Sequence, residues 1–347
     1  MILTREFLHR LPKADLHIHL DGSLRVETVL DLARKKNILL PSFDIEELTR
    51  ILTIQDRVDD LGKYIERFQI TLSVMQDVDG LYRAAFELAE DAAKDNVRYM
   101  EVRYSPILHQ RNGLELDTIV KAVINGLNDA ERHFNIRTGI IICGIRNINP
   151  KASEMLAELA VKYKNRGVVA FDLAGVEYNY PAKDHLKAFY NVRNNNVNIT
   201  LHAGEAFGPS SIHQAIHYCG AHRVGHGTRL IEDPDLLNYV RDHRIPLEVC
   251  LLSNYQTRSV ISLKEHPFIH YLNRQLRVTL NTDNTLISGT SMTDEFVLAV
   301  ETFNLSLEQV FKVILNGFKS VFLGFEEKVD IYKRINAELL QIRKECE

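Results

Sequence analysis

Short β-rich runs alternate with longer helical patterns along this chain of 347 residues, and that alternation restricts its fold more than any other feature. The runs are rich in Val, Ile, Thr and Tyr, and Gly, Pro, Asn or Asp bounds most of them. We predict strands at 14–20, 98–104, 138–145, 168–174, 198–203, 223–226, 246–252 and 277–282. Strands and helices in this order predict an α/β fold, a (β/α)₈ TIM barrel forming a single domain over residues 1–347. An open, doubly wound sheet is the alternative fold.

Amphipathic patterns between the strands predict the helices of the barrel, at 80–95, 115–134, 151–164 and 210–219. Asp233-Pro234 is typical of a helix start with proline in the first turn. Ser306-x-x-Gln309 is typical of a capping box before a helix near the C-terminus.

Nearly eighty residues separate the first two predicted strands, far more than one crossover needs. We therefore expect two or three extra helices inserted after strand 1. Leu61, Tyr64, Ile65 and Phe68 share one helical face in this segment, at i, i+3, i+4 and i+7. That face either packs in the core or belongs to a helical lid, at roughly 40–80, over the catalytic mouth of the barrel.

Composition and charge exclude several classes of protein. Lys plus Arg number 42 against 46 Asp plus Glu, a net charge of −4 without a basic block, so we expect neither nucleic acid nor a membrane as partner. No apolar run reaches membrane-spanning length, and the first residues lack the apolar core of a signal peptide. The four cysteines form no CxxC pair, which indicates free thiols in a reducing compartment. A soluble cytoplasmic protein follows, of unspecified oligomeric state.

Two histidines in the first strand, His17 and His19, point to the same face because side chains alternate along a strand. Alone, this pair indicates two partly buried histidines more readily than half of a metal site. Other chemically capable residues, however, follow other strands: His202 and Glu205 the fifth, His226 the sixth and Asp283 the eighth. In a barrel the carboxyl ends of the strands form the active face, so these side chains should converge.

Three imidazoles and a carboxylate, from His17, His19, His202 and Asp283, suit Zn²⁺ and leave room for a water molecule. A bound metal lowers the pKa of such a water to roughly 7. The fourth strand ends at 171–175 without the lysine that would bridge two metals, which favours one zinc ion per chain. Glu205 remains free to carry protons.

Several motifs together resemble the adenosine deaminase family of the amidohydrolase superfamily, in family order across residues 12–295. They are the run 12–24, His202-Ala-Gly-Glu205, Gly225-His-Gly227, Ser253-Asn254 and Leu280-Asn-Thr-Asp283. The resemblance implies a zinc-dependent enzyme of purine metabolism. Such an enzyme hydrolyses adenosine and 2′-deoxyadenosine to inosine and 2′-deoxyinosine with release of ammonia.

The resemblance also implies roles for individual residues. It makes His17, His19, His202 and Asp283 the zinc ligands, and Asp283 also orients the attacking water. Glu205 would protonate purine N1, and His226 would position the hydroxide and stabilise the charge that develops at C6. Substrate contacts are implied for His19, Asp21, Leu61, Tyr64, Phe68, Gly175 and Asn284.

Among these contacts, Gly175 would let the backbone approach purine N3, and Asp21 would accept a hydrogen bond from a ribose hydroxyl. The helix bearing Tyr64 and Phe68 would close over the base. Asn284 stands where many family members have a second acid, and its amide can donate to purine N7 without first being protonated.

Two other functions are open at this point. Relatives that deaminate free adenine usually carry Glu at the position of Asp21, so Asp21 favours a nucleoside over adenine, while Asn284 leaves a modified 6-aminopurine nucleoside as an alternative. A non-catalytic purine-binding relative is the third reading. It should have lost a proton-transfer group, whereas Glu205 and His226 are both present.

Overall fold

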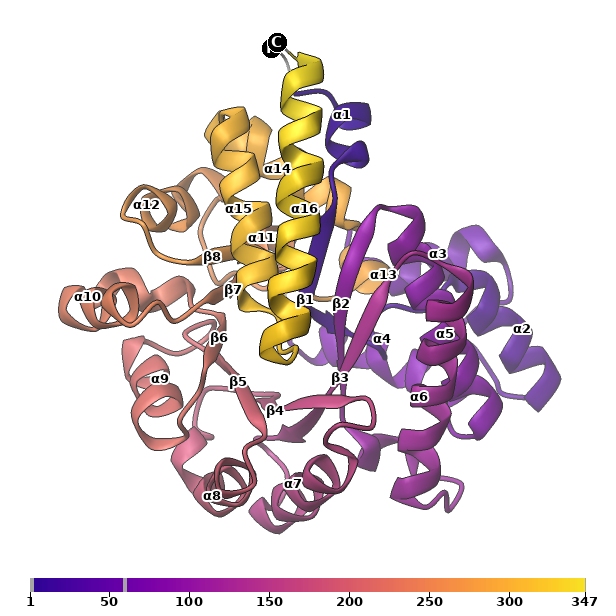
Figure 1. The fold of residues 1–347 in the computed structure, drawn as a ribbon. Coiled ribbons are helices and arrows are strands. Elements are labelled where there is room, and N and C mark those ends of the chain that lie inside the picture. The colour runs from indigo at the N-terminus through magenta and orange to yellow at the C-terminus, as the bar shows by residue number, and fades with distance from the viewer. Residues whose placement is uncertain (1–2, 59–60, 347) are drawn as a thin grey trace.

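The strands of this protein, seen in a computed structural model that describes residues 3–58 and 61–346, form a parallel 8-stranded sheet in the order β1 to β8. They are β1 (Lys13–His19), β2 (Val97–Tyr104), β3 (Arg137–Ile145), β4 (Val168–Ala174), β5 (Asn198–Ala203), β6 (Arg223–His226), β7 (Leu247–Val249) and β8 (Val278–Leu280). The strands surround a central axis and the helices lie outside them (Figure 1). The predicted (β/α)₈ barrel is confirmed.

The barrel closes where the first strand meets the chain just beyond the last one. Ile18 forms a parallel bridge with Asp283. The backbone amide of His19 donates to the carbonyl of Asp283 at 2.7 Å, and the backbone amide of Asp283 donates to the carbonyl of His17 at 2.8 Å. The Asn281 side chain accepts from the amide of Leu16 at 2.9 Å. The seam of the barrel therefore runs between residues predicted to bind the metal.

The helices follow the alternation that the sequence predicts. They are α1 (Arg5–Arg10), α2 (Val26–Lys36), α3 (Ile45–Leu52), α4 (Leu61–Val74), α5 (Val78–Lys94), α6 (Leu116–His133), α7 (Pro150–Tyr163), α8 (Leu186–Asn194), α9 (Pro209–His213), α10 (Pro234–Asp242), α11 (Leu251–Gln256), α12 (Phe268–Asn273), α13 (Thr285–Ser288), α14 (Met292–Phe303), α15 (Leu307–Ser320) and α16 (Phe325–Cys346). Short 3₁₀ turns are η1 (Pro106–His109), η2 (Ala182–His185), η4 (Thr228–Glu232) and η5 (Leu263–Glu265), and η3 (Gln214–Tyr218) is a π-helical turn.

The predicted helix starts are present. Asp233 caps α10, which has Pro234 in its first turn, and Ser306 forms a capping box with Gln309 at the start of α15. The prediction of a strand over 246–252 is wrong at its end, since β7 stops at Val249 and α11 begins at Leu251. The reason is a distant carboxylate: Glu295, fully buried, accepts the amide of Leu251 at 3.0 Å and so caps the helix.

Three helices, α2, α3 and α4, precede α5 in the long connection between β1 and β2. The hydroxyl of Thr71, on α4, donates to the carbonyl of Asp21 at 2.6 Å. This bond fastens α4 to the loop that leaves β1, at the carboxyl end of the barrel.

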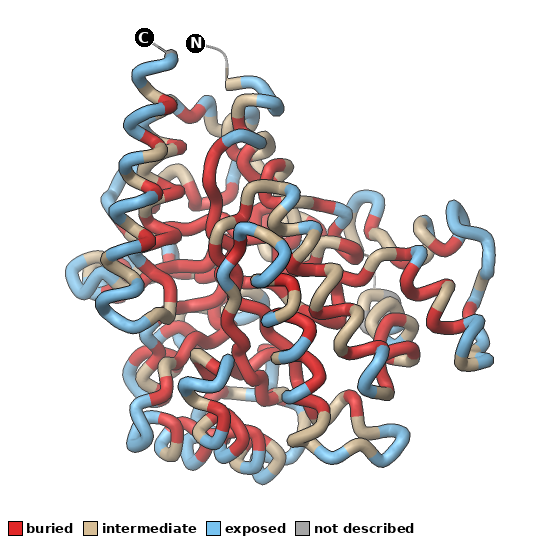
Figure 2. Tube along the Cα trace, turned by 45° about the vertical axis from the view of Figure 1, so that its right-hand side comes forward, coloured by how far each residue is buried: buried red, intermediate tan, exposed pale blue. Residues whose placement is uncertain are grey.

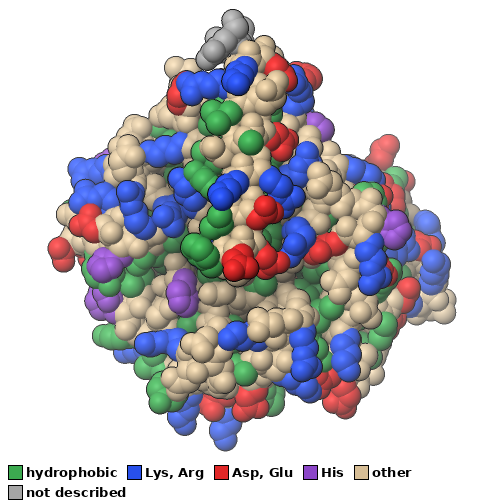
Figure 3. Space-filling view, in the orientation of Figure 1, with side chains coloured by type: hydrophobic (Ala, Val, Ile, Leu, Met, Phe, Trp, Pro, Cys, Tyr) green, Lys and Arg blue, Asp and Glu red, His purple; other side chains and the backbone are tan. Residues whose placement is uncertain are grey.

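The core lies around the strands, where the tube in Figure 2 is buried almost without interruption. Leu16, Ile18 and Phe171 are at most 1% exposed. On the face drawn in Figure 3, Lys and Arg lie among Asp and Glu. In the part of the chain that the structure describes, no helix is long and apolar enough to cross a membrane.

One histidine of this core should make stability depend on pH. His109 is fully buried beside Tyr104, its Nδ1 lies 3.1 Å from the carbonyl of Met75, and burial lowers its pKa from 6.5 to about 4. Between these two values the unfolded chain binds a proton that the folded protein does not. The free energy of unfolding should therefore fall with decreasing pH, by about 1.4 kcal/mol per unit from this residue.

The measurement is urea unfolding of wild type and His109→Phe from pH 7 to pH 4. Other buried histidines contribute equally to both proteins, so the slope should be shallower in the variant. Parallel slopes would contradict the assignment.

Candidate active site

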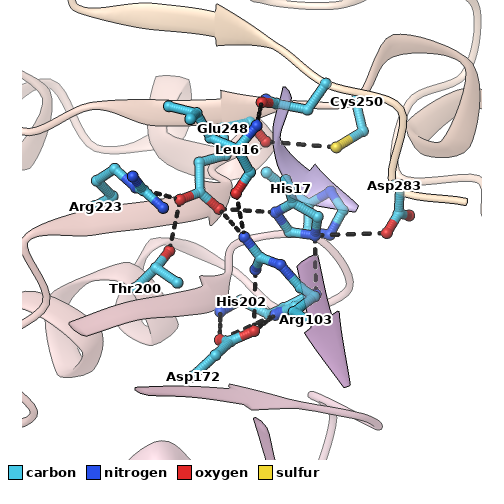
Figure 4. Close-up of polar contacts among 12 residues, drawn as sticks. Leu16, His17, Arg103, Asp172, Thr200, His202, Arg223, Glu248, Cys250 and Asp283 are labelled. Atoms are coloured by element: carbon cyan, nitrogen blue, oxygen red, sulfur yellow. Dashed lines mark hydrogen bonds and ion pairs between the residues drawn. The ribbon is translucent and has the colours of Figure 1, made fainter. Parts of the chain in front are cut away.

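Four donor atoms meet at the carboxyl end of the barrel. Nε2 of His202 lies 3.0 Å from Nε2 of His17 and 3.1 Å from Nε2 of His19. Oδ1 of Asp283 lies 3.5 Å from Nε2 of both His17 and His19. Ligand atoms held tetrahedrally at about 2.0–2.1 Å from zinc are about 3.3 Å apart, so the four donors have the spacing of a metal site. Figure 4 shows three of them, on different strand ends.

His226 is the fifth group of this cluster. His17, His202, His226 and Asp283 offer ligand atoms that all lie within 4.8 Å of one another. His226 Nε2, however, is 3.6 Å from Oε2 of Glu205. His19 and His226 therefore both border the donors of His17, His202 and Asp283, and this cluster could hold a metal ion.

Two buried carboxylates orient the imidazoles. Nδ1 of His17 donates to Glu248 at 2.8 Å, and Nδ1 of His202 donates to Asp172 at 2.9 Å. Each bond places the proton on Nδ1 and leaves the lone pair of Nε2 facing the other donors. Burial lowers the pKa of His17 to about 4, which keeps its ring neutral and able to bind a metal.

An arginine joins the two carboxylates inside the barrel (Figure 4). Arg103 donates to Asp172 at 3.0 Å and to Glu248 at 2.8 Å, and Arg223 donates to Glu248 at 2.6 Å. Burial alone would raise the pKa of Glu248, but Arg103 and Arg223 outweigh it and hold that pKa well below its usual range. Both carboxylates therefore stay ionised against the imidazoles.

Asp283 and Glu205 each have a hydroxyl partner. Oδ2 of Asp283 accepts the hydroxyl of Ser253 at 2.6 Å, and Oε1 of Glu205 accepts the hydroxyl of Thr257 at 3.0 Å. Both partners lie in or directly after α11, the helix that replaces the end of the predicted strand. The other carboxylate oxygen of Glu205 remains the one nearest His226.

The loop that carries Glu205 is held by a second glutamate. Glu177 accepts four amides in succession, from Gly204 to Phe207, at 2.6–3.1 Å. Consecutive amides that point to one anion fix the backbone as an anion-binding nest does. Glu177 therefore fixes the backbone from which the side chain of Glu205 extends.

The predicted substrate contacts surround this centre unevenly. The hydroxyl of Tyr64 lies 3.4 Å from Nδ2 of Asn284, and the rings of Tyr64 and Phe68 meet edge to face at 5.3 Å. Burial, and then the charges of Asp283, Glu205 and Asp21, raise the pKa of Tyr64 well above 10. Helix α4 therefore lies over the cluster.

Asp21 and Asn284 each keep one buried side-chain oxygen without a partner among the described residues. Burial raises the pKa of Asp21 to about 6. Gly175 has φ +92° at the end of β4, and a Cβ there would lie 2.9 Å from Oδ1 of Asn147. The side chains of Leu61 and Ile65 fall outside the described part of the chain.

Sequence reasoning missed Asp172, Glu248, Arg103 and Glu177. Asp172 and Glu248 stand as single charges within apolar strands, and a charge in that setting must find a buried partner, whereas Arg103 shares its strand with Arg98 and Glu101. The alternation of side chains along each strand could have predicted that these side chains face the interior of the barrel. Glu177 lies in a loop, and nothing in its neighbours marks it.

Imidazoles and a carboxylate gathered at the strand ends of such a barrel define a class of protein, the metal-dependent hydrolases of the amidohydrolase type. Residues 12–338 match the family model described as adenosine deaminase. The chain therefore belongs to the adenosine deaminase family, whose members are hydrolytic deaminases.

Two curated relatives give the level of similarity. The adenosine deaminase of Mycobacterium marinum is 43% identical over 349 residues, which cover 96% of each chain. A probable adenosine deaminase of Dictyostelium discoideum is 39% identical over 340 residues, which are 98% of this chain but only 44% of that protein.

Solved structures are similar over the same length. Adenine deaminase from Arthrobacter aurescens is 26% identical, with a TM-score of 0.87 over 95% of this chain and 99% of its own. The N6-methyl-AMP deaminase of Arabidopsis thaliana is 28% identical, with a TM-score of 0.85 over 96% of this chain and 98% of its own. The barrel is thus shared by proteins with different 6-aminopurine substrates.

The orienting role of Glu248 can be separated from its role in the ion-pair network. Glu248→Gln should lower the affinity for a divalent metal about 10- to 100-fold, because His17 loses its anionic acceptor. The matched control is Glu101→Gln, which also takes a carboxylate from Arg223 but touches no imidazole. Both variants should be less stable to urea, and only Glu248→Gln should lose metal affinity in chelator competition. Equal metal affinities in the two variants would contradict this role.

Proposed function

We propose that this protein is a zinc-dependent adenosine deaminase, which hydrolyses adenosine and 2′-deoxyadenosine to inosine and 2′-deoxyinosine with release of ammonia. One observation carries the proposal: four donors at 3.0–3.5 Å lie beside Glu205, the candidate proton carrier, and His226. The relative from Mycobacterium marinum, similar over nearly its whole length, carries the same named activity.

The donor set fits zinc. Three neutral imidazole nitrogens and one carboxylate oxygen match the ligands of catalytic zinc, with one ion per chain. A zinc ion held there would lower the pKa of a water molecule to roughly 7. The remaining steps of the reaction depend on the protein's own side chains.

Three of those side chains have separate roles in the reaction. Glu205 protonates purine N1, which makes C6 electrophilic, and its Thr257 contact holds the carboxylate in one orientation. His226 faces the attacking oxygen and stabilises the charge that develops at C6. Asp283, fixed by Ser253, orients the water for attack.

The substrate would lie between these groups and α4. In this proposal Asp21 accepts a ribose hydroxyl, the Gly175 backbone approaches purine N3, and Asn284 donates to N7. Tyr64 and Phe68 cover the base, with Leu61 predicted on the same helical face, and His19 borders it. The unpartnered oxygen of Asp21 supports its contact, because buried polar atoms otherwise find partners. Nδ2 of Asn284, the atom that would donate to N7, donates to the Tyr64 hydroxyl at 3.4 Å in the structure.

A deaminase of free adenine or of a modified nucleoside is the second candidate. The fold is shared with an adenine deaminase and an N6-methyl-AMP deaminase. Asp21 favours a nucleoside over adenine, while Asn284 is the residue that would allow an altered base. A non-catalytic purine-binding protein is disfavoured, because Glu205 and His226 are both retained.

We also propose that residues 1–347 act as one domain, in which α3 and α4, within the segment at roughly 40–80, form an inserted lid, and that the protein works in the cytoplasm. Cys143, Cys219 and Cys250 are buried free thiols, as expected in a reducing compartment.

The function is tested by incubating the zinc-loaded protein with adenosine, 2′-deoxyadenosine, adenine and N6-methyladenosine and following the ultraviolet absorbance of the purine. The proposal expects the two adenosines to be the preferred substrates. Turnover of adenine or of N6-methyladenosine alone would transfer the assignment to the second candidate. No turnover of any of them by zinc-loaded protein would refute an enzyme of this kind.

Glu205→Gln should retain zinc and lose at least about 100-fold in kcat, because an amide cannot protonate N1. Glu232→Gln is the matched control, on an exposed side chain paired with Arg229, and should behave as wild type. His17→Ala should instead lose the metal. A near-normal kcat in Glu205→Gln would remove this residue from the mechanism.

Asn284→Asp should deaminate adenosine with kcat/KM about 10-fold lower, and the loss should grow with rising pH. The physical reason is that a carboxyl group donates to N7 only while protonated, whereas the amide donates throughout. The pH dependence of kcat/KM is the measurement. A profile that coincides with that of wild type would argue against the N7 contact.

A further inference from the structure

His226 is the last member of a chain of hydrogen bonds that begins at a backbone amide. The amide of Phe268 donates to Nδ1 of His266 at 3.1 Å. Nε2 of His266 lies 3.2 Å from Oδ1 of Asn254, and Nδ2 of Asn254 lies 3.0 Å from Nδ1 of His226. The side chains of this relay, His226, Asn254 and His266, are at most 2% exposed.

The starting group fixes the direction of every bond in the relay. A backbone N–H can only donate, so Nδ1 of His266 must accept, and the proton of that ring is on Nε2. Nε2 of His266 then donates to Oδ1 of Asn254. The amide nitrogen of Asn254 is thereby turned toward His226 and donates to its Nδ1.

The reverse arrangement does not fit. If Asn254 were turned around, its amide nitrogen would need a lone pair on Nε2 of His266, and the proton of that ring would then face the N–H of Phe268. Two donors would oppose each other in a buried site, which costs about 1–3 kcal/mol. Burial also lowers the pKa of His266 to about 3, so the ring remains neutral with a single proton.

We propose that Asn254 and His266 are positioning residues that fix His226 with its proton on Nε2, so that His226 presents a hydrogen-bond donor to the reaction centre. Nδ1 of His226 already accepts from Asn254, and Nε2 is the nitrogen that faces Glu205. Neither Asn254 nor His266 is among the proposed metal ligands or the predicted substrate contacts.

This inference sharpens the proposed function, on which its mechanistic consequence rests. A neutral ring with a proton on Nε2 has no lone pair there with which to take a proton from the attacking water. His226 therefore stabilises the incoming oxygen by donating to it, and Glu205 is the group that carries protons to the purine.

The tautomer can be measured directly. Zinc-loaded protein with ¹⁵N-labelled histidine gives long-range ¹H–¹⁵N spectra that distinguish a protonated nitrogen from one with a lone pair. The signal of His226 is assigned by its absence in His226→Gln. The proposal expects a protonated Nε2 and an accepting Nδ1, and a protonated Nδ1 in wild type would overturn it.

Asn254→Asp reverses the polarity at one point of the relay. A carboxylate accepts at both oxygens, so the proton of His226 should move to Nδ1, and kcat should fall about 100-fold while KM changes little. Asn316→Asp is the matched control, since Asn316 is also buried but donates to Val278 at the other end of β8. Its His226 signal should be that of wild type. An unchanged tautomer in Asn254→Asp would also overturn the proposal.

His266 gives a second pair of variants in case Asn254→Asp folds poorly. In His266→Gln the side-chain amide can accept from Phe268 and donate to Asn254, so the tautomer and kcat should be kept. His266→Leu removes both bonds, and the His226 signal should then be a mixture of tautomers. Identical His226 signals in His266→Gln and His266→Leu would contradict the relay. Because these spectra require no turnover, the relay and the proposed deamination can fail independently.

Discussion

The guanidinium of Arg103 is the group on which the rest of the site depends. It lies between Asp172 and Glu248, and these carboxylates hold the rings of His202 and His17. A buried carboxylate without a cation would take up a proton, and a protonated one no longer orients an imidazole as an anion does. The lone pairs that face the metal position are therefore maintained by a charge balance deeper in the barrel. Arg103 itself contributes no atom to the cluster.

The same division between acting and supporting residues recurs around the centre. Glu177 holds the loop of Glu205, Ser253 holds Asp283, and Asn254 holds His226. His226 and Asp283 have φ values of +62° and +61°, a region that residues other than glycine seldom adopt. Packing at the strand ends must compensate for that strain, and the result is a set of groups already oriented before charge develops.

The sequence was sufficient for the barrel and for the residues at the strand ends. Most strands are short β-rich runs between turn residues, and parallel strand ends converge whatever their exact length. It was insufficient for Arg103 and Glu248, whose pairing joins residues 145 positions apart within two strands. The end of β7 was predicted wrongly for a similar reason, because the carboxylate of Glu295, which caps α11, comes from a later helix. Pairings of this kind depend on the closed fold, which no local pattern contains.

The barrel seam gives the metal position a place in the folding of the chain. The contacts that close the seam join residues as far as 267 positions apart, and the proposed ligands lie on both of its sides. A bound ion would link the two ends of one of the longest loops that the chain can form, and such a link removes much of the conformational entropy of the unfolded chain. The four proposed ligands can meet only after the last strand has been synthesised. A growing or truncated chain without that strand therefore lacks the complete proposed metal site.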